Sequence, residues 1–443
     1  MLNGRSRYDN IMNNGCFITK EIDWATQVIV ARLNQYFKHT EFDFNSIIPP
    51  ELNQGQGAYC DYVCRHNLKS EDRLCLVLAV IPILKPQLFD CFNVKNSNTD
   101  QRFVEFGCVE RDGGSGVLPT LNTLLFILVG DDVEKKIQLT NYFASRDILN
   151  KNVLFPDSVL SPTDEFISEV LFEKRYAPAF STTFPARKIT TTRSWEDLVL
   201  DNKTMKQIDD IKLWIDNGNR LLDEWNLRGK IKNGYRALFY GTPGTGKTFT
   251  ATLLGKVTGR DVYCVDLSMV VSKYVGETEK NLSNVFDVAE GKNWILFFDE
   301  ADALFGKRTG VKDSHDRYAN QEVAYLLQRV ENYDGLVILS TNQKTNIDDA
   351  FARRFQSAIR FSMPNAEERK KLWMATFSEK SYFEEKIDID DIASRYEIAG
   401  GAILNVVQYC SLMAISRNDT CIRYDDLIEG IRREFEKEGR VFV

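Results

Sequence analysis

The sequence of 443 residues has no excess of positive charge and few histidines. It contains three histidines, and its nine cysteines are scattered along the chain. Cys60, Cys64 and His66 come nearest to a zinc site, but no second pair completes it, which favours packed thiols. Acidic residues outnumber basic ones, 63 against 56, giving a formal net charge of −7. This balance argues against nucleic acid as the main partner.

Long hydrophobic runs are also missing. The longest apolar stretch, Leu74 to Leu84, is about half the length of a membrane span and contains Pro82. The polar beginning M-L-N-G-R-S-R-Y-D-N lacks the features of a secretory signal. Scattered cysteines suit a reducing compartment. We therefore expect a soluble, cytoplasmic protein with no membrane partner.

A glycine-rich loop between two apolar stretches is the strongest motif in the chain. Residues 237–240 are typical of a buried parallel strand, and the small apolar residues after the loop indicate a helix. The loop has the sequence G-x-x-x-x-G-K-T and consists of Gly241, Thr242, Pro243, Gly244, Thr245, Gly246, Lys247 and Thr248. Such a loop directs backbone N–H groups at phosphate oxygens, with the lysine on the β- and γ-phosphates and the threonine hydroxyl on Mg²⁺.

Alternating apolar runs and helical patterns indicate the fold class. The five short runs are 237–240, 262–266, 294–299, 336–341 and 358–361. Because helical patterns separate them, they predict an α/β fold: a five-stranded parallel sheet with helices on both faces. After Pro364 the pattern becomes wholly helical, which predicts a small lid.

The remaining chain carries no chemical motif, so its organisation is predicted from pattern alone. Short helical and apolar stretches favour a small α+β or winged-helix-like N-terminal domain that binds a protein rather than DNA. Two prolines and five threonines between 176 and 192 are typical of an extended linker. The predicted domains are an N-terminal substrate- or partner-binding domain (1–174), a linker (175–194), a large nucleotide-binding subdomain (195–363) and a helical lid (364–443).

Polar residues follow two of the predicted strands. Asp299 and Glu300 end the third strand, and Asn342 ends the fourth. Charges at the end of a buried strand are costly unless they are paired or bind metal. Beside a phosphate loop, Asp299 would hold Mg²⁺ and Glu300 would polarise the attacking water. Asn342 could orient that water, although asparagine also ends strands for turn reasons.

Two further segments are candidates for functions that require an oligomer. Arg353 and Arg354 are either solvated or act as arginine fingers on a neighbour's phosphate, which requires a ring. Lys273, Tyr274 and Val275 form a loop in which an exposed aromatic is unusual; Tyr274 either packs locally or faces a central pore. Residues 305–318 could form a second pore loop, where His315 is better explained by a loop hydrogen bond than by catalysis.

Together these motifs resemble the AAA+ ATPases over about residues 195–443. The resemblance implies ATP and Mg²⁺ as cofactors, a homo-oligomer that is a hexamer, and a protein substrate. It also implies that Gly401 and Ala402 close on the adenine. Two departures stand out. Arg353 and Arg354 are adjacent, whereas related fingers are commonly spaced by a Pro-Gly insertion, and Leu404 stands where many relatives place a basic sensor residue.

A narrower resemblance is visible in residues 176–181, 195–200 and 298–308, which are similar to AAA+ proteins encoded with bacterial contractile injection systems, the phage-tail-like particles. The expected function is Mg²⁺-dependent ATP hydrolysis that remodels, unfolds or threads a protein. The alternatives are an ATP-regulated assembly factor or scaffold, a nucleic-acid motor and a small-molecule kinase.

Overall fold

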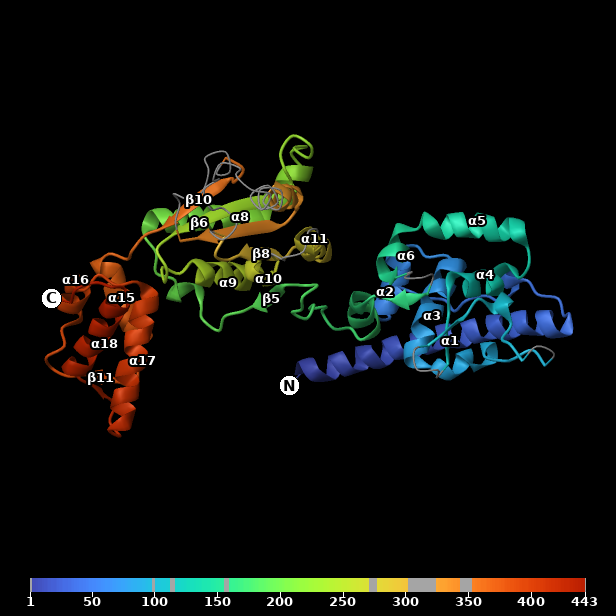
Figure 1. Ribbon diagram of the computed structural model, residues 1–443, viewed down its shortest axis with the longest axis horizontal. Helices are drawn as coiled ribbons and strands as arrows, with labels where there is room; N and C mark the ends of the chain where they lie inside the picture. Colours follow the sequence, from blue (N-terminus) through green and yellow to red (C-terminus); the bar gives the residue numbers. More distant parts are fainter. Residues whose placement is uncertain are drawn as a thin grey trace. The chain divides into compact units, whose positions relative to one another are not determined.

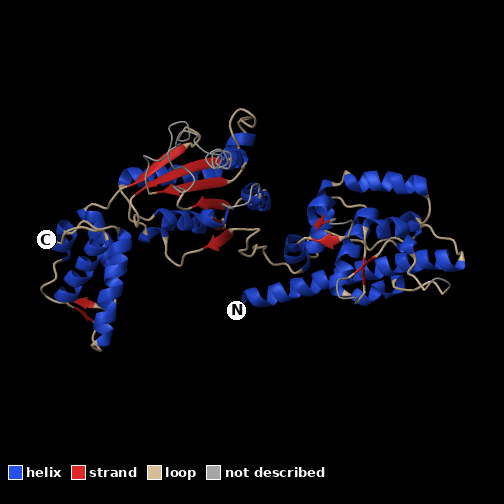
Figure 2. Cartoon of the chain, in the orientation of Figure 1, coloured by secondary structure: helices blue, strands red, loops and turns tan. Residues whose placement is uncertain are grey.

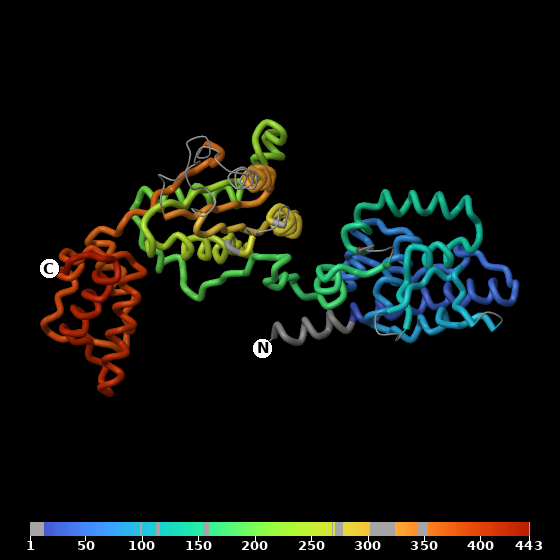
Figure 3. Tube along the Cα trace, viewed as in Figure 1, coloured from blue at the N-terminus to red at the C-terminus, as the bar shows by residue number. Residues whose placement is uncertain are grey.

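The computed structural model describes residues 2–97, 100–111, 116–154, 159–270, 277–301, 324–342 and 353–442 (Figure 1). Contacts between Cα atoms divide the chain into two compact units, Met1–Ala177 and Pro178–Val443. Figure 3 follows the Cα trace through each unit.

The N-terminal unit is mainly helical. Its helices are α1 (Leu2–Lys38), α2 (Ala58–Arg65), α3 (Ser70–Leu84), α4 (Leu121–Val129), α5 (Val133–Ala144), α6 (Asp147–Asn152) and α7 (Asp164–Phe166), with 3-10 helices at Phe44–Ser46, Pro86–Phe92 and Val104–Phe106 and a π turn at Ile167–Leu171. The strands β1 (Val109–Glu110), β2 (Val117–Leu118), β3 (Val153–Leu154) and β4 (Ser161–Pro162) form two antiparallel ladders. Among the described residues each ladder pairs two residues per strand, so this unit is more helical than the predicted α+β or winged-helix-like domain.

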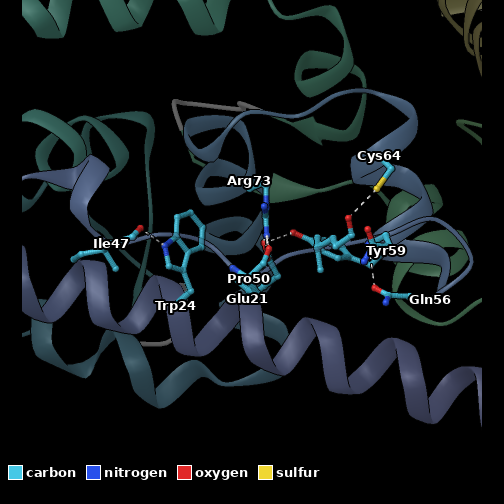
Figure 4. Close-up of polar contacts among 10 residues, drawn as sticks. Glu21, Trp24, Ile47, Pro50, Gln56, Tyr59, Cys64 and Arg73 are labelled. Carbon is cyan, nitrogen blue, oxygen red and sulfur yellow. Dashed lines mark hydrogen bonds and ion pairs between the residues drawn. The ribbon is translucent and has the colours of Figure 1, made fainter.

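A buried ion pair lies inside this unit (Figure 4). Glu21 on α1 is fully buried, and the guanidinium of Arg73 on α3 binds its carboxylate. The Tyr59 hydroxyl donates to the same carboxylate at 3.0 Å, and Arg73 also donates to the Pro50 carbonyl at 2.8 Å. Burial and the neighbouring carboxylate of Glu21 raise the pKa of Tyr59 well above its ordinary value, so its hydroxyl stays a donor. The network joins α1, α2 and α3 around one charge pair.

Within the described residues, no single helix is long and apolar enough to cross a membrane. The helix α3 and the 3-10 helix Pro86–Phe92 reach that length and composition together, with a bend of 109° between them.

The second unit is built on a six-stranded sheet, ordered β10-β6-β9-β8-β7-β5. Its strands are β5 (Ala186–Ile189), β6 (Tyr235–Gly241), β7 (Val262–Val265), β8 (Ile295–Phe298), β9 (Leu336–Thr341) and β10 (Ser357–Phe361). The five predicted strands are all present and run parallel to one another. The sixth, β5, pairs antiparallel with β7 and comes from the segment predicted to be a linker, so that prediction was wrong for residues 186–189.

Helices cover both faces of this sheet, as Figure 2 shows. They are α8 (Asn202–Asp223), α9 (Lys247–Thr258), α10 (Leu267–Val270) and α11 (Glu277–Ala289), together with the helical residues 324–332 and a 3-10 helix at Trp195–Asp197. One face packs against Ile208 and Ile211 of α8 and Leu254 of α9. The other packs against Leu282 and Phe286 of α11. Two separate cores therefore hold the sheet, as the apolar strands predict.

The lid follows β10 and has its own core. It contains α15 (Ala366–Thr376), α16 (Ile389–Arg395), α17 (Gly400–Ser416) and α18 (Tyr424–Lys437), and a short parallel pair, β11 (Tyr382–Phe383) and β12 (Cys421–Ile422). Trp373, Ile403 and Leu427 are among the buried residues at its centre. The helical lid is confirmed as a local fold, with the two-residue strand pair added.

Candidate nucleotide site

The glycine-rich loop joins β6 to α9 in the backbone shape that glycine permits. Gly244 and Gly246 have φ values of 74° and 97°, which side chains disfavour. Gly241 has a φ of 144°, and a Cβ there would lie 2.0 Å from the Phe361 carbonyl oxygen. The loop therefore keeps this path only with glycine at these positions.

Lys247 begins α9 and is buried to 7% exposure. Its ammonium donates to the carbonyl oxygens of Gly241 and Thr242 at 2.8 and 3.0 Å, and to Oδ1 of Asn342 at 3.0 Å. These three acceptors are uncharged, whereas a buried ammonium is best stabilised by an anion. The arrangement brings together two predicted site residues that lie 95 positions apart in the sequence.

The predicted metal ligands also meet. The Thr248 hydroxyl donates to Oδ2 of Asp299 at 3.0 Å, and the Glu300 amide donates to Oδ1 at 3.0 Å. Glu300 is exposed and has a φ of 51°, a conformation that non-glycine residues seldom adopt outside special sites. The backbone therefore leaves the regular strand path directly after Asp299.

Burial raises the pKa of the neighbouring Cys264 thiol to about 11, and the charge of Asp299 contributes in the same direction. Cys264 on β7 therefore remains a neutral thiol at physiological pH, and it adds no charge beside the Asp299 carboxylate.

These residues fit a nucleoside triphosphate and Mg²⁺. The hydroxyl and carboxylate of Thr248 and Asp299 are the oxygen ligands that Mg²⁺ prefers. The helix α9 begins at Lys247, and no side chain caps its N-terminus. Exposed N–H groups at a helix start, next to a buried ammonium, bind phosphate groups well.

The loop borders a cavity of about 560 Å³. Residues 243–249, Asp299, Glu300 and Asn342 line it. The lining also includes residues that were not among the predicted site residues, namely Thr191, Arg193, Leu198, Val199, Leu200, Ser362, Pro364, Glu368 and Leu372. Several of these lie in or beside the predicted linker, so that segment borders the candidate site as well as connecting domains.

The lid reaches the phosphate loop at the start of α17. The Gly401 amide donates to the Gly244 carbonyl at 2.9 Å, and a Cβ on Gly401 would lie 3.1 Å from Gly244 Cα. Gly401 and Leu404 line the cavity, whereas Ala402 is packed in the lid core. The side chain of Ala402, a predicted nucleotide contact, therefore faces the lid core rather than the cavity, because adjacent residues of a helix face different directions.

Two anchors hold the connection between the sheet and the lid. Asp201, which caps α8, accepts a hydrogen bond from the Ser362 hydroxyl at 3.2 Å. Buried Arg369 of α15 donates to the Pro364 carbonyl and, at 2.7 Å, to the Ala393 carbonyl. Ser362 is thus tied to the sheet side and Pro364 to the lid side.

The two candidate finger arginines have different surroundings. Arg354 binds Glu331 at 2.7 Å, and Glu331 is also paired with Lys232. The hydrogen bond and charge of Lys232, and then the charge and hydrogen bond of Arg354, lower the pKa of Glu331. Arg353 is exposed and forms no ion pair with any residue in the described ranges. The candidate pore loop Lys273, Tyr274 and Val275, and the second candidate loop with His315, lie outside the described residues.

Comparisons with known proteins agree with this site. Residues 237–363 match the model of the "ATPase family associated with various cellular activities (AAA)". The chain is 33% identical over 188 residues to "Cell division protein C" of Sulfolobus acidocaldarius, covering 40% of this chain and 50% of that protein. It is 30% identical over 213 residues to the "26S proteasome regulatory subunit 6B homolog" of Dictyostelium discoideum, covering 46% and 53%.

A third relative covers more of the chain. The "Cell division cycle protein 48 homolog" of Archaeoglobus fulgidus is 26% identical over 364 residues, which are 76% of this chain and 48% of that protein. The chain spans about half the length of these curated relatives. The family model and the relatives together support an ATPase domain of the AAA family in this chain.

Proposed function

We propose that this protein is a Mg²⁺-dependent ATPase that works as a ring of identical subunits and uses hydrolysis to remodel, unfold or thread a protein. The observation that carries the ATPase activity is a convergence at the carboxyl ends of three neighbouring strands. Lys247 and Thr248 follow β6, Asp299 follows β8 and Asn342 follows β9, and hydrogen bonds already join them in pairs. Ligands bind at this edge of parallel sheets.

Each residue has a role that follows from its place. Mg²⁺·ATP, when bound, supplies the phosphoanhydride bond and a divalent charge that offsets negative charge during hydrolysis. Thr248 and Asp299 would hold the metal, and Lys247 would exchange its carbonyl acceptors for phosphate oxygens. Glu300, exposed beside them, would take a proton from the attacking water. Asn342 would orient that water and Lys247.

In this proposal, a positive group from a neighbouring subunit stabilises the negative charge on the γ-phosphate during hydrolysis. Arg353 is a better candidate for this role than Arg354, because Arg354 already forms an ion pair with Glu331. A group that each subunit gives to the next in one direction closes into a ring when the rotation closes. Arginine fingers in related chemistry raise turnover by factors of about 10³–10⁵.

A protein substrate is supported by the names of the relatives, which include a proteasome regulatory subunit and a vesicle-fusing ATPase. In this proposal Tyr274 grips the substrate in the pore. The finer assignment, service of a contractile injection system in the bacterial cytoplasm, rests on the similarity of residues 176–181, 195–200 and 298–308. Co-sedimentation of the ATPase with purified tail-like particles tests it, and absence of binding in both ATP and ADP would refute it.

The variant Glu300→Gln tests the core of the proposal. Phosphate release should fall by about 10²–10⁴, the contribution of a positioned base, while binding of a fluorescent ATP analogue persists. Sedimentation of the same variant with ATP should give the mass of a ring. Undiminished phosphate release would remove Glu300 from the mechanism, and a monomer at saturating ATP would remove the ring.

Two variants and one titration separate the proposal from its alternatives. Tyr274→Ala should keep ATP hydrolysis and lose substrate unfolding; normal function in that variant would favour a scaffold whose assembly ATP controls. Tyr274→Phe is the matched control, because phenylalanine keeps the aromatic side chain. Binding of DNA with a steep dependence on salt would favour a nucleic-acid motor instead.

A further inference from the structure

Ser340 is a polar residue at the centre of the sheet, and the proposed mechanism leaves it unused. It lies on β9 and is fully buried. Its backbone carbonyl accepts a hydrogen bond from the Ala301 amide at 2.9 Å. Within the part of the chain that the structure describes, its hydroxyl has no hydrogen-bond partner. Such a group destabilises the protein relative to an alanine, so its presence calls for a partner in another state.

Ser340 and the metal carboxylate of Asp299 each come directly after the last residue pair of the β8–β9 ladder. That pair is Phe298 of β8 and Leu339 of β9, and beyond it the Ala301 amide donates to the Ser340 carbonyl. On the other side of β9, Ser340 pairs with Phe239 of β6. Ser340 therefore occupies the row between the phosphate-loop strand and the strand that ends in Asp299.

The alternation of side chains puts both groups on the same face. Ile338 of β9 and Phe297 of β8 belong to the core beneath α8 and α9. Residues two positions further along a strand point the same way, so Ser340 and Asp299 face α9 as well. The bond from Thr248 of α9 to Asp299 agrees with this orientation.

We propose that Ser340 is a positioning residue for the metal carboxylate, donating a hydrogen bond to Asp299 when Mg²⁺·ATP is bound. The inference rests on the proposed function. In the present structure Oδ2 of Asp299 accepts from Thr248, and Oδ1 accepts from the Glu300 amide. Mg²⁺ held by Thr248 and Asp299 would draw on the same two oxygen atoms that this bond now joins. The hydroxyl of Ser340 would then supply a further donor that keeps the carboxylate oriented.

Metal binding in Ser340→Ala tests this role. Mn²⁺ serves as the probe, and its binding is measured by electron paramagnetic resonance with saturating ATP. Loss of an outer hydrogen bond to a metal ligand should weaken Mn²⁺ binding about tenfold. The ligand-free variant should at the same time melt no lower than the wild type, because the unpaired hydroxyl has been removed. A structural role would instead lower the melting temperature.

Ser357→Ala is the matched control. Ser357 lies on β10 in the same sheet, and its hydroxyl is also buried and unpaired among the described residues. Its removal should leave Mn²⁺ affinity unchanged. Ser340→Thr, which keeps the hydroxyl in a residue that suits strands, should recover most of the affinity. Wild-type Mn²⁺ affinity in Ser340→Ala, or an equal loss in Ser357→Ala, would overturn the proposal.

Nucleotide binding without metal separates this inference from the proposed function. In EDTA, a fluorescent ATP analogue should bind the wild type and Ser340→Ala equally. If the analogue does not bind the wild type in EDTA or in Mg²⁺, the proposed ATPase function fails. If the analogue binds the wild type and Ser340→Ala equally, and the two proteins have the same Mn²⁺ affinity, only the role of Ser340 fails.

Discussion

The amide of Gly401, at the start of the lid helix α17, donates a hydrogen bond of 2.9 Å to the carbonyl of Gly244 in the phosphate loop. The contact is close because neither residue has a side chain. We expect Gly401→Ala to weaken ATP binding about tenfold, because the new Cβ would lie 3.1 Å from Gly244 Cα and displace the lid or the loop. Equilibrium titration with a fluorescent ATP analogue measures the change.

Gly400→Ala is the control for that experiment. A Cβ on Gly400 would meet its nearest neighbours at 3.5 and 3.6 Å, which are ordinary contact distances. Its ATP affinity should equal that of the wild type. Equal effects at both positions would show that the lid helix, rather than its contact with Gly244, determines affinity.

Arg353 and Arg354 should have different roles, Arg353 in hydrolysis and Arg354 in stability. Arg353→Ala is expected to reduce phosphate release by at least about 10³, with ATP affinity kept, because Arg353 is exposed and unpaired among the described residues. Arg354→Ala should lower the free energy of unfolding by about 1 kcal/mol or less, since its bond with Glu331 is partly exposed. Full hydrolysis by Arg353→Ala rings would contradict this division.

Asp201 should give stability a pH dependence. Burial alone would raise the pKa of its carboxyl, but hydrogen bonds from the hydroxyl and amide of Thr204, and from Ser362, hold it below its ordinary value. A lowered pKa stabilises the fold above the unfolded value, about 3.9, and this contribution is lost as the pH falls through the folded pKa. Asp201→Asn should therefore cost about 1 kcal/mol at pH 7 and progressively less below about pH 4.

Urea denaturation at several pH values tests this expectation. Asp209→Asn, which removes an exposed acid from the same helix, is the control for the loss of a charge on that helix. A difference between wild type and Asp201→Asn that stays constant from pH 7 to pH 3 would show that the charge of Asp201 is irrelevant.

The buried pair of Glu21 and Arg73 should dominate the stability of the N-terminal unit. Glu21→Gln leaves a charged guanidinium without its partner, and should lower the free energy of unfolding by about 3–5 kcal/mol. Scanning calorimetry of the full chain measures the loss. The exposed pair of Arg102 and Glu110 supplies the comparison, because Glu110→Gln should cost at most about 1 kcal/mol. Similar losses in the two variants would refute the argument from burial.

Sequence alone predicts the phosphate side of the site well. Its loop is contiguous, and parallel strands bring Asp299 and Asn342 to the same edge whatever the details of packing. Contacts between distant segments could not be predicted from the sequence, because no local pattern indicates that Gly401 contacts Gly244 or that Asp201 contacts Ser362.

The edge strand was missed for a different reason. Residues 186–189 are Ala-Arg-Lys-Ile, lie between a proline and threonines, and show no alternation of polar and apolar residues. Their strand conformation is set by β7, whose free edge supplies the hydrogen bonds. In the lid, one helical step separates Gly401 at the cavity from Ala402 in the core, a difference that the sequence motif alone does not indicate.

The two anchors between sheet and lid leave a very short hinge. Ser362 is bound to the cap of α8, and Pro364 is bound to Arg369 of α15. Only Met363 separates them, and the proline ring fixes one of the dihedral angles that follow it. A rotation of the lid relative to the sheet that keeps both anchors would therefore occur at the backbone dihedral angles around Met363.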